Sequence, residues 1–407
     1  MSIDIRAPRD DEMREFLNTL EAAFGYLPTE ELIERLPKVL EPSRLLVATE
    51  GAGIVGVGGA FRFNFTIPGN DIPVAGVTMV GVLPSHRRRG VLTRMMRRQL
   101  EDARSWNEPI AVLWASEGSI YQRFGYGLAS RQLTLDIERD RAVFLEHAEP
   151  TGTARMVGND QALEILPGIY DRVRAQRTGM PSRSKQWWVN HRLADPEDER
   201  NGGGPMWRVV VEINGRPEAY ALYRLHGSWE ESLPSGHVSI IEVVAATPEA
   251  TREVWRYVFG IDLSARVKAY WEPIDTPLQH LLSEVRRLRL GLKDALWLRI
   301  VDVRGALEAR SYEVDDTLTF RLVDHFCDWN AGVWRIEVDG GKPRVAESDA
   351  APDLALSARD LGATYLGGTS FTELALAGRV QELRPDALRR ADALFHNAPA
   401  PWCPEVF

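Results

Sequence analysis

Cysteine, long apolar runs and an excess of positive charge are all missing from this chain. Cysteine occurs only twice in 407 residues, as Cys327 and Cys403, and no C-x-x-C spacing is present. We therefore predict neither a disulfide framework nor a cysteine-based zinc cluster, and a reducing, cytoplasmic compartment fits best. No apolar run approaches the roughly 20 residues of a membrane span, and the charged N-terminus lacks the apolar core of an export signal. We expect no membrane partner.

The charge balance and the missing motifs exclude further classes of function. The formal net charge is −9 and the pI is about 5.6, which argues against nucleic acid as a partner and is compatible with a cationic substrate. The eight histidines show no metal-ligand spacing, so no metal is predicted, and His86 is interpreted as a surface residue. Hydrolase, kinase and dehydrogenase functions lack support, because no Ser-His-Asp arrangement, P-loop or dinucleotide fingerprint appears.

One stretch of the chain has a clear succession of predicted elements. Residues 77–82 have the apolar composition of a buried strand, and a Pro-Ser pair ends this strand before the basic turn at 86–90. An amphipathic helix is predicted from Val91, because apolar residues recur there at helical spacing. A second buried strand is predicted over Ile110–Trp114. The stretch therefore reads strand, turn, helix, strand.

The turn at 86–90 has the chemistry of an anion site. The first N–H groups of a helix have no partner within the helix, and together with the helix dipole they attract negative charge. Gly90 allows close approach of a ligand, and Arg87, Arg88 and Arg89 add positive charge. The turn therefore favours a diphosphate or the 3′-phosphate of coenzyme A, although arginine-rich turns also occur as solvated surfaces.

This stretch resembles a known family. Strand, R-R-x-G-type turn, helix and strand is similar to the cofactor half of GCN5-related N-acetyltransferases (GNAT). The longer strings VLPSHRRRGVLTRMM and AVLWASEGSIYQRFGYG resemble the Eis (enhanced intracellular survival) acetyltransferases, and the resemblance extends over nearly the whole chain. It implies acetyl-CoA as cosubstrate, an amine as acceptor and a homohexameric assembly.

The predicted fold class is mixed α and β, with two tandem GNAT folds followed by a sterol-carrier-like α+β domain. The predicted domains are 1–138, 139–290 and 291–407. Strand, turn, helix and strand recur between residues 238 and 271, but the second turn has no glycine and carries Glu249, so we expect this fold to have lost its cofactor site. Residues 195–205 are expected to form an exposed loop, for which a tolerated insertion is favoured over a flexible lid.

The family resemblance also assigns residues to the acetyl-CoA site. The backbone at the end of the 77–82 strand would pair with pantetheine, and the N–H of Val82 would polarise the thioester carbonyl. The expected cofactor contacts are Val80, Gly81, Val82, Arg88, Arg89, Gly90, Val91, Leu92, Thr93, Ile120 and Tyr121.

Acetyl transfer to an amine also needs an acid for the departing thiolate and a base for the amine. Tyr126 is the candidate acid, because a phenol with an ordinary pKa of about 10 stays protonated at neutral pH, and the Eis family uses a tyrosine at this motif in that role. The alternative is a core tyrosine satisfied by a backbone partner. By resemblance the base is the chain-terminal carboxylate, here on Phe407, and Glu117 is the reserve candidate. The tail 402–407 is apolar and aromatic, as a docked terminus would be.

The predicted function is acetyl-CoA-dependent N-acetylation of polycationic small molecules, with aminoglycosides acetylated at several amines. Phe24, Tyr26, Phe65 and Glu405 are the expected substrate residues, with core packing as the alternative for Phe65. Val406 stands where some family members carry an acid, which leaves the substrate range open. Alternative acceptors are protein lysines or polyamines. A non-catalytic sensor of acetyl-CoA or lipid is the alternative from a different class.

Overall fold

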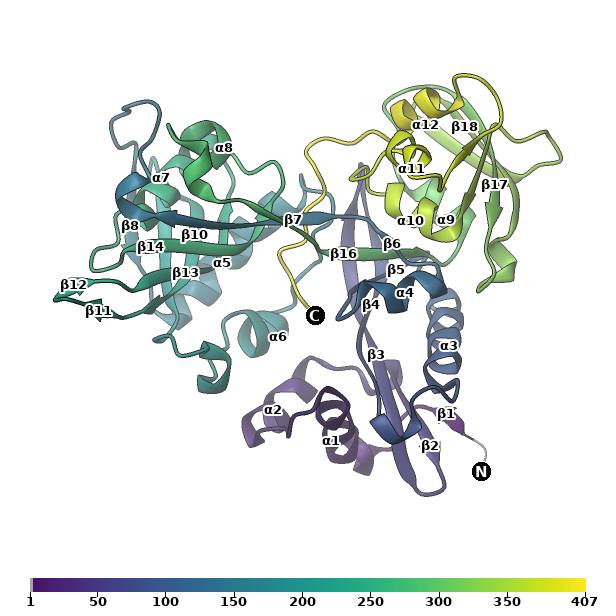
Figure 1. Cartoon of the computed structure of the whole chain (residues 1–407), viewed down its shortest axis with the longest axis horizontal. Helices are drawn as coiled ribbons and strands as arrows, with labels where there is room; N and C mark the ends of the chain where they lie inside the picture. Colours follow the sequence, from purple (N-terminus) through teal and green to yellow (C-terminus); the bar gives the residue numbers. More distant parts are fainter. Residues whose placement is uncertain (1–2) are drawn as a thin grey trace. The chain divides into compact units, whose positions relative to one another are not determined.

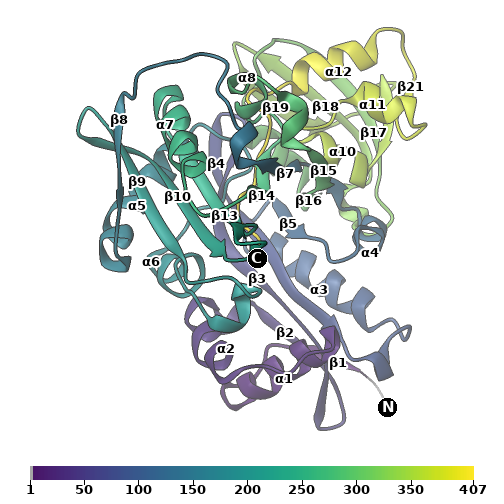
Figure 2. The same cartoon turned by 60° about the vertical axis from the view of Figure 1, so that its left-hand side comes forward.

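The computed structural model describes residues 3–407, and these fall into two units, each of which is described by itself (Figures 1 and 2). Unit 1 contains the chain up to Ser130 together with residues 295–401 and 405–407. Unit 2 contains residues 131–294 and 402–404. Each unit therefore combines segments that are far apart in the sequence, and the last residues of the chain are divided between the two.

A seven-stranded sheet forms the N-terminal part of unit 1, in the order β1-β2-β3-β4-β5-β16-β6. Its strands are β1 (Asp4–Arg6), β2 (Leu45–Glu50), β3 (Gly53–Ile67), β4 (Asn70–Val82), β5 (Ile110–Trp114), β6 (Gly127–Leu128) and β16 (Leu296–Ile300). Only β4 and β5 pair in parallel, and the chain crosses between them through helix α3 (Val91–Ser105). This is the strand, turn, helix, strand stretch predicted from the sequence.

Helices cover this sheet by their apolar sides. In α1 (Met13–Phe24), Phe16, Leu17 and Leu20 are buried in one cluster with apolar residues of β2 and β3, as their helical spacing predicts. The helix ends where Gly25 takes a left-handed φ of 87°, which glycine adopts without strain. Two short helices, α2 (Glu30–Arg35) and α4 (Gly118–Tyr121), complete this part.

The C-terminal part of unit 1 is a five-stranded sheet with four helices. The strand order is β19-β18-β17-β20-β21. The strands are β17 (Thr317–Val323), β18 (Gly332–Asp339), β19 (Lys342–Glu347), β20 (Leu354–Ser357) and β21 (Gln381–Glu382). The helices are α9 (Val303–Ala309), α10 (Ala358–Thr364), α11 (Phe371–Leu376) and α12 (Ala387–Phe395). Capping boxes at Ser357 and Ser370 fix the starts of α10 and α11.

Unit 2 is built on a second seven-stranded sheet, in the order β15-β7-β14-β13-β10-β9-β8, and a small hairpin, β11 (Trp229–Glu230) with β12 (Leu233–Pro234). The seven strands are β7 (Arg131–Glu138), β8 (Gly152–Met156), β9 (Trp207–Ile213), β10 (Arg216–His226), β13 (His237–Ala245), β14 (Arg266–Pro273) and β15 (Gly291–Asp294). The β9–β10 turn falls at Asn214-Gly215, both with positive φ, as is typical of an Asn-Gly hairpin.

Two helices pack on opposite faces of this second sheet (Figure 2). Helix α7 (Pro248–Phe259) shares a buried cluster with Val209 and Ala221, whereas α5 (Asn159–Arg174) shares another with Val210 and Tyr220. Neighbouring residues of a strand point to opposite faces, so the two clusters are separate cores. Two short helices, α6 (Lys185–Trp187) and α8 (Leu278–Leu281), flank the sheet.

In each of the two large sheets, one strand comes from a part of the sequence next to the other sheet's strands. Strand β16 follows unit 2 in the chain but pairs with β5 and β6 in the first sheet. Strand β7 follows the N-terminal elements but pairs with β14 and β15 in the second. The domain boundaries near residues 138 and 290 stay predictions. None of the helices within residues 3–407 combines the length and apolar character of a membrane span.

Candidate active site

Strands β4 and β5 pair over a short stretch and then diverge, and we call this divergence the first fork. They pair only through Ala75 with Ala111 and through Gly76 with Val112. Beyond Gly76, β4 continues to Val82 while it pairs with β3 on its other edge. Within residues 3–407, the β5-facing edge of residues 77–82 therefore has no strand partner. An unpaired strand edge is a ready template for another extended chain, such as a pantetheine arm.

A β-bulge shapes this edge. Met79 and Val80 together oppose the single residue Gly58, and Met79 takes a left-handed φ of 54°. A bulge bends a strand and redirects its backbone groups, and such bulges are common beside active sites. Gly81 follows directly, and a Cβ there would lie 2.9 Å from Cβ of Ala23. Glycine is therefore needed where α1 comes close to the free edge.

The three arginines of the basic turn have different surroundings. Arg87 donates to the backbone carbonyls of Val82 (3.2 Å) and Ala23 (2.7 Å), so it holds the turn against β4 and α1. Arg89 pairs with Glu50 at 2.5 Å. Arg88 is exposed, has a left-handed φ of 62° and makes no hydrogen bond or ion pair with the described residues. Arg88 is therefore the arginine most available to a ligand anion.

Glu50 pairs with two residues of this turn. Its carboxylate binds Arg89 and also Nε2 of His86, at 2.9 Å, and these two partners, Arg89 first, lower the pKa of Glu50 to about 2. The other ring nitrogen of His86 contacts Oγ of Ser85 at 2.8 Å. His86 is thus a structural residue of the turn.

Helix α3 begins at this turn with an uncapped N-terminus. Gly90 precedes the helix with a φ of 78°, and no side chain accepts from the first-turn N–H groups. A Cβ on Gly90 would meet nothing within 4 Å, so glycine is required here by its backbone conformation rather than by space. The predicted contacts Val91, Leu92 and Thr93 form this first turn. Uncapped N–H groups beside an exposed arginine have the chemistry that attracts an anion.

Tyr126 lies at the centre of the core beside the first fork. It is fully buried in a cluster that contains Val77 of β4 and Leu113 of β5, and its ring meets that of Tyr121 edge-on with centroids 6.0 Å apart. Its hydroxyl has no hydrogen-bond partner among the described residues. Burial raises the pKa of Tyr126 well above its ordinary value. The alternative of a core tyrosine satisfied by a backbone partner is therefore not what the structure shows.

An unpredicted ion pair lies next to Tyr126. Arg299 of β16 and Asp324 are both buried and pair at 2.5 Å. A Cβ on Gly125, which has a φ of 84°, would lie 2.3 Å from Nη1 of Arg299, so glycine lets the arginine pass beneath the Tyr126 loop. Arg299 partly opposes the rise in the pKa of Tyr126. Sequence reasoning missed this pair, because Arg299 follows Tyr126 by a long interval and appears only as one polar residue in an apolar strand.

The chain terminus is docked in unit 1. Trp114 of β5 donates from Nε1 to the backbone carbonyl of Glu405 at 2.5 Å. The Phe407 ring meets the Phe63 ring edge-on, with centroids 5.0 Å apart, and a Cβ on Gly76 would lie 3.4 Å from the Phe407 ring. Gly76 is the last β4 residue that pairs with β5. The terminal residue therefore packs at the origin of the first fork.

The predicted substrate residues divide into exposed and buried ones. Phe24 and Tyr26 are 48% and 68% exposed, and the Phe24 ring lies near Gly81 of the free edge. Phe65 is fully buried and pairs with Ile72 in the β3–β4 hairpin, which favours core packing, the alternative given for it. The Glu405 side chain is also fully buried.

The remaining predicted residues lie around α4. Tyr121 is buried against the Tyr126 cluster, and burial raises its pKa, whereas Ile120 packs at the margin of the same cluster. Glu117, the reserve base, is exposed just before α4. Within residues 3–407, no group of three or more histidine, cysteine or carboxylate side chains is arranged to hold a metal ion.

Comparisons with known proteins decide the family. Residues 4–129 and 179–300 match two acetyltransferase (GNAT) domain families, and residues 303–404 match a sterol carrier protein domain family. The chain is 42% identical over 413 residues to an uncharacterized N-acetyltransferase of Streptomyces avermitilis, with 100% of both covered. It is 32% identical over 412 residues to the N-acetyltransferase Eis of Mycobacterium tuberculosis, with 97% of each covered. The chain belongs to the Eis family of N-acetyltransferases.

A solved Eis structure has the same fold. Eis1 from Mycobacterium abscessus matches with a TM-score of 0.86 at 33% identity, over 100% of both chains. The predicted fold class, two GNAT folds followed by a sterol-carrier-like domain, is confirmed. The protein is an N-acetyltransferase, and GNAT enzymes take acetyl-CoA and an amine acceptor. The free edge of β4, the uncapped α3 and the exposed Arg88 fit this cosubstrate.

The second GNAT fold of this Eis-family chain differs at the corresponding helix start. Oγ1 of Thr247 accepts from the N–H of Ala250 at 3.1 Å, so α7 is capped by its own chain. Glu249 adds a negative charge in the same turn. A capped and acidic helix start repels phosphate, which accords with the expected loss of the cofactor site in this fold.

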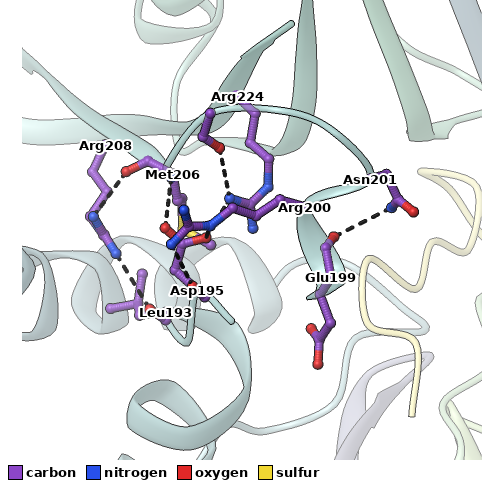
Figure 3. Close-up of polar contacts among 9 residues, drawn as sticks. Leu193, Asp195, Glu199, Arg200, Asn201, Met206, Arg208 and Arg224 are labelled. Atoms are coloured by element: carbon purple, nitrogen blue, oxygen red, sulfur yellow. Dashed lines mark hydrogen bonds and ion pairs between the residues drawn. The ribbon is translucent and has the colours of Figure 1, made fainter. Parts of the chain in front are cut away.

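The loop at residues 195–205 is tied down at its base (Figure 3). Asp195 accepts from Arg224, from Arg200 (3.2 Å) and from the N–H of Met206 (2.9 Å). Arg224 also donates to the backbone carbonyl of Gly204 at 3.2 Å. The tip at residues 197–199 is exposed, as predicted. The ion pairs close both ends of the loop onto β10, a feature of a fixed insertion rather than of a flexible lid.

Proposed function

We propose that this Eis-family enzyme transfers acetyl groups from acetyl-CoA to several amines of polycationic small molecules, aminoglycosides among them. Tyr126 is the general acid and the Phe407 carboxylate is the general base. One observation carries the proposal: a buried tyrosine hydroxyl without a partner among residues 3–407 lies beside the first fork, and the chain terminus packs at the origin of the same fork. A buried hydroxyl without a partner costs free energy, and a terminus is ordered only where contacts hold it, so both features are consistent with a role in the reaction.

The proposed acetyl-CoA site consists of the free edge of β4 and the basic turn at residues 86–90. Backbone groups of Val80, Gly81 and Val82 would hold the pantetheine arm as an added strand, and the N–H of Val82 would donate to the thioester carbonyl. The N–H groups of the first turn of α3 and the guanidinium of Arg88 would hold the phosphates. Arg89 contributes through Glu50, by fixing the turn. Acetyl-CoA supplies the activated acetyl thioester.

The acid step suits the surroundings of Tyr126. A leaving thiolate has a conjugate-acid pKa of about 8.5, so it accepts a proton readily from a nearby donor. Because burial raises the pKa of Tyr126, its hydroxyl remains protonated at every pH at which the enzyme works. Tyr121 and Ile120 complete the apolar wall that keeps water from the hydroxyl.

The base step suits the docked terminus. A carboxylate that is held in place attracts a cationic amine and accepts one of its protons, directly or through water. The Phe407 ring fixes this carboxylate by packing on Phe63. Phe24 and Tyr26 offer exposed aromatic faces to a cation near the free edge. Val406 replaces the acid of some relatives and is 37% exposed, which would weaken the attraction for the most highly charged acceptors.

Three further parts complete the proposal. A homohexamer follows from the resemblance to the Eis acetyltransferases, and a cytoplasmic location from the two cysteines without disulfide or metal spacing. Domain boundaries near residues 138 and 290 belong to the same proposal. Protein lysines and polyamines remain the competing acceptors.

The test is an acetylation assay with matched termini. The purified chain is incubated with acetyl-CoA and, separately, with aminoglycosides, polyamines and lysine peptides, while thiol release and product mass are followed. Two variants accompany it: Tyr126→Phe, and a chain with one glycine added after Phe407. The added glycine keeps the Phe407 ring and moves only the carboxylate.

Multiply acetylated aminoglycosides from the wild type, with at least a hundredfold loss of kcat in both variants, support the proposal. Turnover restricted to peptides or polyamines would replace the acceptor class. Full activity of the glycine-extended chain would refute the terminal base.

A further inference from the structure

The second GNAT fold has a fork of its own. Strands β13 and β14 pair in parallel from His237 with Arg266 to Ile240 with Ala269. They then diverge, although β13 continues to Ala245 and β14 to Pro273. The crossover between them is α7, as α3 is the crossover between β4 and β5. This second fork therefore corresponds, element for element, to the first fork, where the pantetheine arm is proposed to bind.

The second fork is occupied by the chain itself. Trp402 donates from its indole Nε1 to the backbone carbonyl of Trp271 on β14, at 2.7 Å. Its backbone N–H donates to the carbonyl of Thr178 at 2.9 Å. Arg192 donates to the carbonyl of Pro404 at 3.3 Å. Residues 402–404 are thus held at both ends by hydrogen bonds within unit 2.

The occupied fork is almost filled. The remaining cavity has a volume of about 10 Å³, which is room for about one water molecule. Trp402 is 6% exposed and Cys403 is 1% exposed. This space is lined by Ile240, Ile241, Glu242, Val243, Ala269, Trp271, Glu272, Trp402 and Pro404. The second fork has no room for a pantetheine arm while the tail is in it.

The wall of the fork is shaped for the tail. Gly179 has a φ of 99°, and a Cβ on it would lie 2.8 Å from the carbonyl oxygen and 2.9 Å from the nitrogen of Trp402. Glycine is therefore required both by conformation and by the close approach of the Trp402 backbone. Trp402 also belongs to the buried cluster of α5 and the second sheet, with Tyr220 and Val244.

We propose that the second GNAT fold has turned its cofactor fork into a socket for residues 402–404, and that Trp402 is a positioning residue for the terminal carboxylate. The inference rests on the proposed role of Phe407 as the base. Only Glu405 and Val406 separate the socket residues from Phe407, and these last three residues are the ones that pack in unit 1. A terminus that frays in most proteins is thereby fixed a few residues upstream of its reacting atom.

A protection experiment tests the socket without reference to catalysis. Carboxypeptidase A is added to the folded chain, and release of Phe407 is followed by mass spectrometry. We expect release from Trp402→Ala at least ten times faster than from wild type. Trp402→Phe, which keeps an aromatic ring but loses the donor to Trp271, should lie between them. Trp229→Ala, at an exposed tryptophan of β11, is the control and should behave as wild type.

A double-variant cycle tests the positioning role. Trp402→Ala should lower kcat at least tenfold while the KM for acetyl-CoA changes less than twofold. In the glycine-extended chain, where the carboxylate is already displaced, the same substitution should change kcat less than twofold, because it acts only through that carboxylate. An equal loss in both backgrounds would show a general structural effect and overturn the positioning role. If Trp402→Ala does not fold, Trp402→Phe takes its place in the cycle.

The outcomes separate this inference from the proposed function. Unchanged carboxypeptidase release from Trp402→Ala overturns the socket, whatever the kinetics show. Full kcat in the glycine-extended chain refutes the terminal base and the positioning role with it. In that case, faster release from the Trp402 variants would still establish the socket as the anchor of the tail.

Discussion

Because the hydroxyl of Tyr126 is unpaired within residues 3–407, we predict that its removal changes stability and activity in opposite directions. Tyr126→Phe removes one oxygen that is fully buried and has no partner among the described residues. A buried polar group without a hydrogen bond costs about 1–3 kcal/mol. We therefore expect the ligand-free Tyr126→Phe enzyme to be more stable than the wild type by about 1 kcal/mol. Its kcat should fall by about 10²–10⁴-fold, the usual contribution of a general acid.

Tyr365→Phe is the matched control. Tyr365 is equally buried in unit 1, but its hydroxyl donates to the carbonyl of Ala306 at 2.8 Å. Removing that oxygen leaves the carbonyl unpaired, so this variant should lose about 1–3 kcal/mol of stability and keep its kcat. The two substitutions delete the same atom from the same residue type, and only the surroundings of the hydroxyl differ.

Urea unfolding of the free enzymes, with steady-state kinetics beside it, measures both quantities. The two variants should shift the unfolding midpoint in opposite directions. Acetyl-CoA should raise the midpoint of the wild type at least as much as that of Tyr126→Phe, because only the wild type has a hydroxyl to satisfy. A loss of stability in Tyr126→Phe as large as in Tyr365→Phe would refute the unpaired hydroxyl. Retained kcat would refute the acid role.

Three further predictions concern single side chains. Burial raises the pKa of Glu272 from 4.5 to about 7, so the folded chain keeps a proton that the unfolded chain has released; stability should fall by about 3 kcal/mol as the pH rises from about 4.5 to about 7. Glu272→Gln should abolish this fall, measured as the difference in the free energy of unfolding by denaturant between pH 5 and pH 8. The same fall in the variant and the wild type would contradict the prediction. Arg88→Ala should raise the KM for acetyl-CoA about tenfold, whereas Arg98→Ala, whose guanidinium pairs with Asp102 on the exposed side of α3, should not; equal effects would exclude a specific phosphate contact. Asp195→Ala should cost about 2–3 kcal/mol and speed tryptic cleavage after Arg200, and unchanged cleavage would mean that the ion pairs do not fix the loop.

The features that could be predicted from the sequence are local. The Asn214-Gly215 turn and the Thr247 cap each depend on neighbouring residues, so the local sequence is sufficient to indicate both. The strand Ile110–Trp114 has the predicted bounds, because a short apolar run between polar flanks has few other ways to be buried. The uncapped start of α3 at Gly90 follows from the same kind of local pattern.

The features that sequence reasoning missed are pairings between distant segments. Nothing around Arg299 indicates that it passes under Gly125 and pairs with Asp324. The different surroundings of Arg88 and Arg89 depend on Glu50, which precedes them by a hairpin. The place of Trp402 in the second fork depends on β13 and β14, far upstream. The identity of a residue does not indicate which distant strand or carboxylate it contacts in the folded chain.

The pairing of β16 with β5 also determines when the first sheet can be completed on the ribosome. Residue 114 ends β5, and residue 300 ends the strand that covers it. At about 5–20 residues per second, synthesis of the intervening chain takes roughly 10–40 s. Throughout that time the edge of β5 is open to any other extended segment, including the same edge of a neighbouring nascent chain. Slow translation of the mRNA between the codons for β5 and those for β16 would lengthen this exposure. The yield of folded enzyme should therefore depend on codon choice far from the codons of the active site.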